Sequence, residues 1–171
     1  MTREEIIQKA EEVCKENNIN TSPVKVTEIC EHYGLKVFEA RLVPEVSGFI
    51  VVQNENFMHF GTGRLIVVNK EHPATRQRFT IAHELAHYIL HRNGEELYAH
   101  RDAGHKGSIE READTFAANI LMPKKIVLDA LTFISEDAPD MFKIRYIARE
   151  FCVAEATAAI RLSELGIIMG G

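Results

Sequence analysis

The spacing of hydrophobic and polar residues predicts helices at both ends of the chain and a few short strands between them. Residues 6–14 carry apolar side chains three and four positions apart, behind a Thr2–Glu5 pair of the kind that caps a helix amino terminus. A second helix is predicted over 26–33 and a strand over 35–40. Apolar, β-branched runs at 49–52 and 65–68 then predict a small antiparallel sheet.

The strongest helical periodicity lies in the middle of the chain. A long helix is predicted from Pro73 to about His91, because its apolar residues recur on one face and an Asn-Gly pair follows it. Residues 95–107 are polar, contain two glycines, and are predicted to be a mobile loop. Ser108 is predicted to cap the next helix, which Pro123 ends. Further helices are predicted at about 124–133, 141–151 and 154–165.

Length and composition favour one globular domain, or one domain with a small appendage, and we predict the α+β class from its mixture of helices and strands. The 171 residues are 46% hydrophobic and 26% charged, enough to bury a core without disulfides. The formal net charge of -5 is unlike the basic surface of a dedicated nucleic-acid binder. No apolar run approaches the roughly 20 residues of a membrane span, and residues 1–5 lack a signal-peptide pattern, so we expect a cytoplasmic protein. We assign 1–125 to the main domain and 126–171 to helices packed on it.

The cysteine pattern adds neither a disulfide framework nor a thiolate metal site. Cys14, Cys30 and Cys152 are widely spaced and form no CxxC motif. We therefore predict three buried free thiols in a reducing compartment.

The sequence from His83 to His87 is an HExxH motif inside the long predicted helix. Residues four apart share a helix face, so the two imidazoles can bind one ion. Zinc catalytic sites commonly combine three protein ligands with a water whose pKa the ion lowers to about 7, and Glu84 is the candidate base for that water. The motif also occurs by chance on ordinary helices, but the apolar opposite face of this helix favours the catalytic interpretation.

A third metal ligand has to come from outside the motif. The HExxHxxGxxH variant is excluded, since Leu90 and Asn93 occupy its glycine and histidine positions. We predict Glu110 as the ligand and Asp114, one turn later, as the acceptor that orients a histidine ring, with Glu112 as the alternative ligand. The simpler interpretation is that these acids are solvated and merely favour a helix amino terminus.

Two segments together resemble the ImmA/IrrE metallopeptidase family. They are residues 79–87 (FTIAHELAH) and 110–123 (EREADTFAANILMP), and 47–50 (SGFI) and 66–69 (IVVN) also sit where that family carries strands. Asp114 is a departure, because the family more often has Asn there, but either residue can accept a hydrogen bond from a histidine.

The resemblance implies a thermolysin-like zinc core, with helices packed on a small antiparallel sheet, and hydrolysis of peptide bonds. Similar proteins from phages and mobile elements cleave a helix-turn-helix repressor, so the implied partner is such a repressor rather than nucleic acid or a membrane. The ligand set also tolerates manganese or iron in place of zinc.

A peptidase also needs a hydrogen-bond donor for the developing oxyanion. His91 lies one turn past His87, and we assign it to a supporting or surface position because helical drift carries it off the ligand face. The candidate donors are Tyr88 and, within 95–107, Tyr98, His100, Arg101 and His105.

Two other functions are weighed against the peptidase. A non-proteolytic zinc-containing regulator could sequester a repressor or antitoxin, although pure metal binding would not need Glu84. Residues 144–162 faintly resemble a helix-turn-helix, yet 124–171 hold six basic and seven acidic residues, a net of -1, which is unsuited to phosphate binding. We therefore interpret 144–162 as a pair of helices packed on the core, or a docking surface for the substrate.

Overall fold

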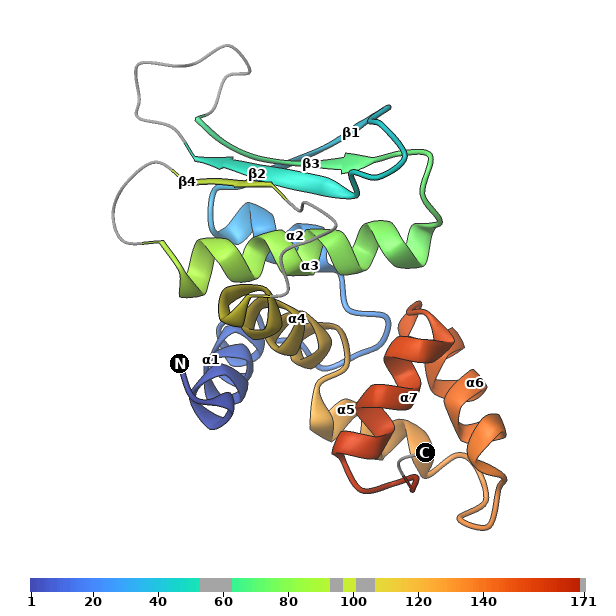
Figure 1. Ribbon diagram of the computed structural model, residues 1–171. Coiled ribbons are helices and arrows are strands. Elements are labelled where there is room, and N and C mark those ends of the chain that lie inside the picture. The colour runs from blue at the N-terminus through green and yellow to red at the C-terminus, as the bar shows by residue number, and fades with distance from the viewer. Residues whose placement is uncertain (53–62, 93–96, 101–106, 170–171) are drawn as a thin grey trace.

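The computed structural model describes residues 1–52, 63–92, 97–100 and 107–169, with the backbone alone for 97–100. Within this part of the chain, the predicted helices and strands occur in the predicted order, together with one strand that was not predicted, and the α+β class is confirmed (Figure 1). The helices are α1 (Arg3–Glu16), α2 (Val26–His32), α3 (Ala74–Leu90), α4 (Ser108–Leu121), α5 (Lys124–Leu131), α6 (Asp140–Phe151) and α7 (Glu155–Glu164). The strands are β1 (Lys36–Ala40), β2 (Gly48–Val52), β3 (Arg64–Asn69) and β4 (Leu97–His100).

The elements are stacked in layers, with α3 at the centre. The sheet lies against one side of α3, α2 lies beside α3 beneath the sheet, and α4 and α1 lie on the opposite side (Figure 1). Helices α5 to α7 form a group next to these layers, and buried apolar residues from all the helices join one hydrophobic core. The helix that carries the HExxH motif is thus covered on two sides.

The sheet is mixed, so the prediction of an antiparallel sheet was wrong in part. The described strands have the order β1-β3-β2-β4, with β2 antiparallel to both β3 and β4, as expected for the first pair. However, β1 pairs with β3 in parallel. Alternation of apolar residues shows which face of a strand is buried but not the direction of its neighbour, which depends here on the connection between β1 and β2.

That connection passes around the end of β3, where Asn69 holds it. The Asn69 side chain is fully buried; its Nδ2 donates to the carbonyls of Val43 (3.2 Å) and Val46 (3.0 Å), and its Oδ1 accepts from the amide of Leu42 at 3.3 Å. One carboxamide therefore satisfies several backbone groups of a segment that has no ladder of its own.

Gly48 allows β2 to lie directly on α3. A Cβ atom at Gly48 would sit 2.6 Å from Thr80 Cγ2 and 2.6 Å from the carbonyl oxygen of Val67. Next to it, the Ser47 hydroxyl accepts from the Arg76 guanidinium at 2.9 Å. These contacts fix α3 against the sheet one to two turns before the HExxH motif.

Three further predictions are corrected. Residues 97–100, predicted as part of a mobile loop, form strand β4, which pairs with β2. Gly107, rather than Ser108, is the N-cap of α4, and Ser108 is its first residue. Cys14 and Cys30 are buried free thiols as predicted, whereas Cys152 is exposed, because it ends α6 in a left-handed conformation that turns the chain toward α7.

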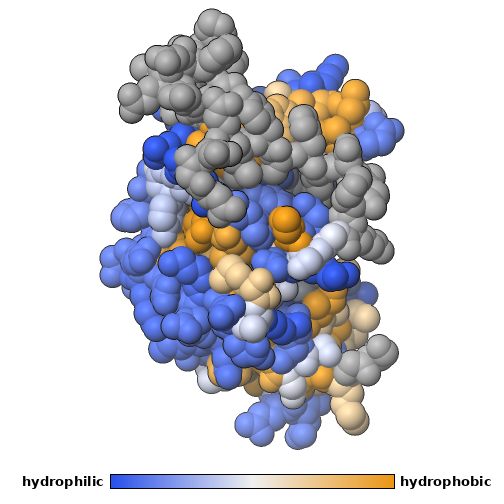
Figure 2. Space-filling model, turned by 60° about the vertical axis from the view of Figure 1, so that its left-hand side comes forward, coloured by the Kyte–Doolittle hydropathy of each residue, from blue (hydrophilic) through white to orange (hydrophobic). Residues whose placement is uncertain are grey.

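One face of the molecule shows scattered rather than continuous apolar residues. On the face in Figure 2, hydrophobic residues form separate patches among hydrophilic ones in the described part of the chain. None of the described helices combines the length and the apolar character that crossing a bilayer requires.

Candidate metal centre

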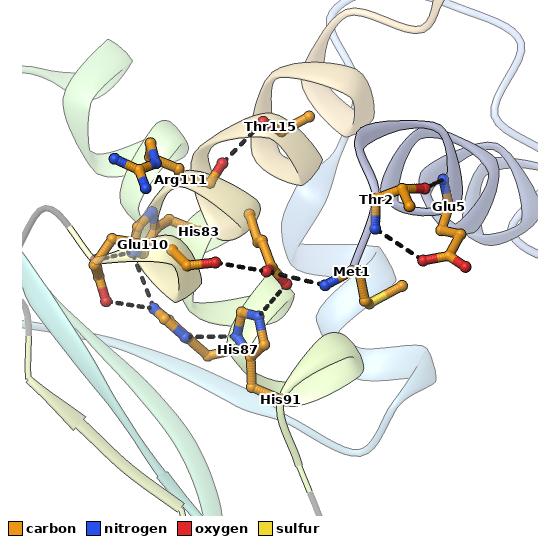
Figure 3. Close-up of polar contacts among 11 residues, drawn as sticks. Met1, Thr2, Glu5, His83, His87, His91, Glu110, Arg111 and Thr115 are labelled. Atoms are coloured by element: carbon orange, nitrogen blue, oxygen red, sulfur yellow. Dashed lines mark hydrogen bonds and ion pairs between the residues drawn. The ribbon is translucent and has the colours of Figure 1, made fainter.

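Three side chains predicted as metal ligands meet between α3 and α4. His83 and His87 lie one turn apart on α3, and Glu110 lies in the first turn of α4 (Figure 3). Helices α3 and α4 pack against each other, and both carry buried alanines, Ala82 and Ala86 on α3 and Ala113 and Ala117 on α4. The packing of α4 on α3 brings Glu110 to the histidines.

The mutual distances of the three side chains fit a tetrahedral ion. Nε2 of His83 lies 3.1 Å from Nε2 of His87 and 3.1 Å from Oε2 of Glu110, and Nε2 of His87 lies 3.4 Å from Oε1 of Glu110. Zinc bonds of about 2.0–2.1 Å in tetrahedral geometry would hold the ligand atoms roughly 3.3 Å apart. The cluster therefore has the donor types and the size that zinc requires.

The other ring nitrogen of His83 shows which nitrogen is free to act as a ligand. His83 Nδ1 lies 2.8 Å from Oδ1 of Asp114, and an ionised carboxylate only accepts hydrogen bonds. Nδ1 is therefore the donor in this contact, and Nε2, on the side of the ring toward His87 and Glu110, is the nitrogen available to a metal. This contact is the one the sequence predicted for Asp114.

His87 contacts His91, which the sequence analysis assigned to a supporting or surface position. His87 Nδ1 lies 3.1 Å from Nδ1 of His91 (Figure 3). On the other side of its ring, His91 Nε2 lies 3.3 Å from Oε2 of Glu112. His91 is the next residue in the i, i+4 series of His83 and His87, so the spacing itself was the available signal. Helical drift moves His91 off the ligand face but onto the far side of the His87 ring.

Glu112, the alternative ligand, lies away from the three-residue cluster. Its Oε1 accepts from the Ser108 hydroxyl at 3.0 Å and from the amino group of Met1 at 3.1 Å. The Met1 ammonium, with smaller contributions from His91 and Ser108, holds the pKa of the Glu112 carboxyl below its usual value. The carboxylate is therefore ionised and bound to other groups.

The predicted catalytic base lies beside the histidines, whereas the predicted oxyanion donor Tyr88 does not. Glu84 is 1% exposed on α3, between the two histidines in sequence. The Tyr88 hydroxyl instead accepts hydrogen bonds from Arg92 (2.8 Å) and Arg64 (3.3 Å), on the side of α3 that meets α2 and β3. Tyr88 is thus not brought to the histidine cluster. The side chains of Tyr98, His100, Arg101 and His105 lie outside the described residues.

Comparison with known proteins agrees with this geometry. The peptidase M78 family model, described as the IrrE N-terminal-like domain, matches residues 30–163. The chain belongs to this family. Metallopeptidase ImmA of Bacillus subtilis (strain 168) is 31% identical to this M78 member over 91 residues, which are 53% of this chain and 51% of the relative.

The resemblance to the ImmA/IrrE family is therefore confirmed, and with it membership in a family of metallopeptidases. The alignment spans about half the length of the ImmA relative. The matched region of the M78 model includes α3 and α4 whole, and so every member of the histidine and carboxylate cluster.

Proposed function

We propose that this M78 family member is a zinc-dependent endopeptidase of the thermolysin-like type. The observation that carries the proposal is the convergence of His83 Nε2, His87 Nε2 and the Glu110 carboxylate at 3.1–3.4 Å from one another. Three ligands of this kind leave one position of a tetrahedral ion for water or substrate, as catalytic rather than structural zinc sites do.

Each residue has a role that follows from its chemistry. His83, His87 and Glu110 would hold zinc, which supplies Lewis acidity when bound: it lowers the pKa of water and polarises a carbonyl. Glu84 would accept the proton of the attacking water and deliver it to the leaving amine. Glu84 is only 1% exposed, so its carboxylate is kept out of bulk solvent. A proton that it has accepted would then be passed to the amine and not lost to water.

Strand β4 supports an extended peptide as the substrate. Among the described strands, β4 lies at one end of the order β1-β3-β2-β4 and also contacts α3. A peptide could add to this edge as a further strand, with backbone hydrogen bonds that hold it near the metal-binding helix. From the family resemblance, we propose a cytoplasmic helix-turn-helix repressor as the substrate.

The first experiment measures zinc per chain in the wild type, Glu110→Ala and Glu112→Ala. We expect about one zinc in the wild type and in Glu112→Ala at saturating zinc, and loss of zinc in Glu110→Ala. A wild type that binds no supplied zinc would refute the metallopeptidase proposal.

The second experiment incubates the zinc-loaded protein with helix-turn-helix repressors, beginning with any encoded beside its gene. Mass spectrometry should find two fragments of a repressor with the wild type and none with Glu84→Gln. An intact, stable complex without fragments would instead establish a binding protein that sequesters its partner.

A further inference from the structure

The two histidines of the cluster are supported in different ways, although both supports come from α4. Asp114 reaches the His83 ring directly, at 2.8 Å. Glu112 reaches the His87 ring through His91, with distances of 3.3 Å and 3.1 Å. The side chains of His91 and Glu112 are 12% and 13% exposed, so water competes little for these contacts.

We propose that His91 and Glu112 are positioning residues that orient the His87 ring and fix its tautomer. This inference rests on the proposed function, since it takes His87 Nε2 as a metal ligand. Histidine ligands generally donate their other N–H to a carboxylate, a carbonyl or a water, and loss of that partner weakens metal binding. His91 extends this arrangement by one ring, because Glu112 points to a different side of α4 from Glu110 and meets His91 there.

The metal-binding nitrogen of His87 and the carboxylate of Glu112 together determine which nitrogen carries the proton in each ring between them. If Nε2 of neutral His87 binds the metal, its Nδ1 carries the proton and donates to Nδ1 of His91. His91 then has its own proton on Nε2, and that N–H donates to Oε2 of Glu112, which as a carboxylate only accepts. Only one set of tautomers satisfies all three groups, and in that set His87 presents its lone pair to the metal.

The position of Glu112 on α4 explains why it supports the site instead of binding the metal. Glu110 and Asp114 are four residues apart and share a face of α4 that meets His83, whereas Glu112, two residues from each, points about 200° around the helix. There it meets His91, and its other oxygen is occupied by Ser108 and the Met1 amino group.

The test measures zinc affinity by competition with a chromogenic chelator, so it needs no substrate. The variants are His91→Ala, Glu112→Ala and the double variant, none of which can accept the hydrogen bond, with His32→Ala and Glu28→Ala as controls on the exposed surface of α2. We expect each site variant to bind one zinc per chain with an affinity about 10–100-fold weaker than that of the wild type. The double variant should be little weaker than the weaker single variant, because the two residues act in series.

Cobalt absorption separates positioning from direct ligation. The intensity of the visible bands, which reports the number of ligands, should persist in the His91 and Glu112 variants and change in Glu110→Ala. If an alanine variant unfolds without metal, His91→Leu or Glu112→Leu replaces it. Wild-type zinc affinity in these variants would overturn the inference but not the proposed function, and so would a change in the cobalt spectrum of Glu112→Ala that matches Glu110→Ala. Failure of the wild type to bind zinc or cobalt would overturn the proposed function, and the inference with it.

Discussion

The Nδ1 atom of His83 on α3 lies 2.8 Å from Oδ1 of Asp114 on α4, so a carboxylate of one helix orients an imidazole of the other. This contact also fixes which His83 nitrogen faces Glu110. We therefore expect replacement of Asp114 to change the affinity of the site for metal.

Replacement of Asp114 should weaken zinc binding more when the new side chain cannot accept a hydrogen bond from His83 than when it can. Asp114→Leu keeps the approximate volume but cannot accept the His83 N–H, and we expect zinc affinity to fall about 10–100-fold. Asp114→Asn retains an acceptor oxygen and should lose less than about 10-fold. Chelator competition at constant pH measures both, and equal losses in the two variants would contradict the proposed hydrogen bond.

The base role assigned to Glu84 predicts a separation of metal binding from catalysis. Glu84→Gln should retain one zinc per chain but slow repressor cleavage by at least about 100-fold, because an amide cannot accept the water proton. Glu28→Gln, an exposed carboxylate on α2, serves as the control and should cleave at the wild-type rate. Wild-type cleavage by zinc-loaded Glu84→Gln would exclude this role.

The close contact of β2 with α3 predicts that Gly48 tolerates no side chain. Gly48→Ala should lower the free energy of unfolding by about 1–3 kcal/mol, since the new Cβ would meet Thr80 Cγ2 and the Val67 carbonyl, each at 2.6 Å. Adding Thr80→Ser should restore only part of the loss, because the carbonyl belongs to the backbone. Gly107→Ala has no atom within 4 Å of its new Cβ and should cost under about 1 kcal/mol in urea denaturation.

Burial of Cys30 predicts a loss of stability at alkaline pH. Burial, with a smaller effect of the Glu31 charge, raises the pKa of the Cys30 thiol from 9.0 to about 12. Below about pH 9 the folded and unfolded chains both keep the proton, whereas between about pH 9 and 12 only the folded chain does, so the free energy of unfolding falls as pH rises.

At pH 10 this difference is worth roughly 1 kcal/mol. Urea denaturation of reduced protein at pH 7.5 and pH 10 should therefore show a larger alkaline loss for the wild type than for Cys30→Ala, in which the thiol is absent. Parallel losses in the two proteins would rule out this contribution.

A buried arginine predicts how strongly the C-terminal helices are attached. Arg161 of α7 is 3% exposed, and its Nε donates to the carbonyl of Met122, at the end of α4, at 3.1 Å. Arg161→Met leaves that carbonyl without its charged donor and should cost about 1.5–3 kcal/mol of unfolding free energy. Arg149→Met, on the exposed face of α6, should change stability by less than about 0.5 kcal/mol, and an equal effect of both would contradict the structural role.

The helices could be predicted from sequence because their periodicity and their ends are local. The Thr2–Glu5 capping box was predicted from residues three positions apart, and it is present. The ends of α3 were also predicted from nearby residues, and the helix runs from Ala74 to Leu90. The parallel pairing of β1 with β3 was not predictable, because it depends on Asn69 holding a segment that precedes it by more than 20 residues. Strand β4 was missed because its partner, β2, is still more remote along the chain.

The metal cluster was predictable in part for the same reason. The i, i+4 spacing of His83 and His87 is local, and Glu110 with Asp114 repeats it on the next helix. Which acid meets which ring depends on how α3 and α4 cross, and this is set by the packing of the two helices in the core rather than by spacing along the chain. The division of the chain at 125/126 stays a prediction.

Zinc held by His87 and Glu110 would join two segments that lie 23 positions apart in the chain. The ion would then act as a crosslink, much as a disulfide closes a loop, and the loop it closes contains the whole connection between α3 and α4. A single proteolytic nick within that connection would leave both helices in the core and both ends of the crosslink in place. The nicked protein would then still bind the metal. Removal of the metal should lower the stability of the nicked protein more than that of the intact protein.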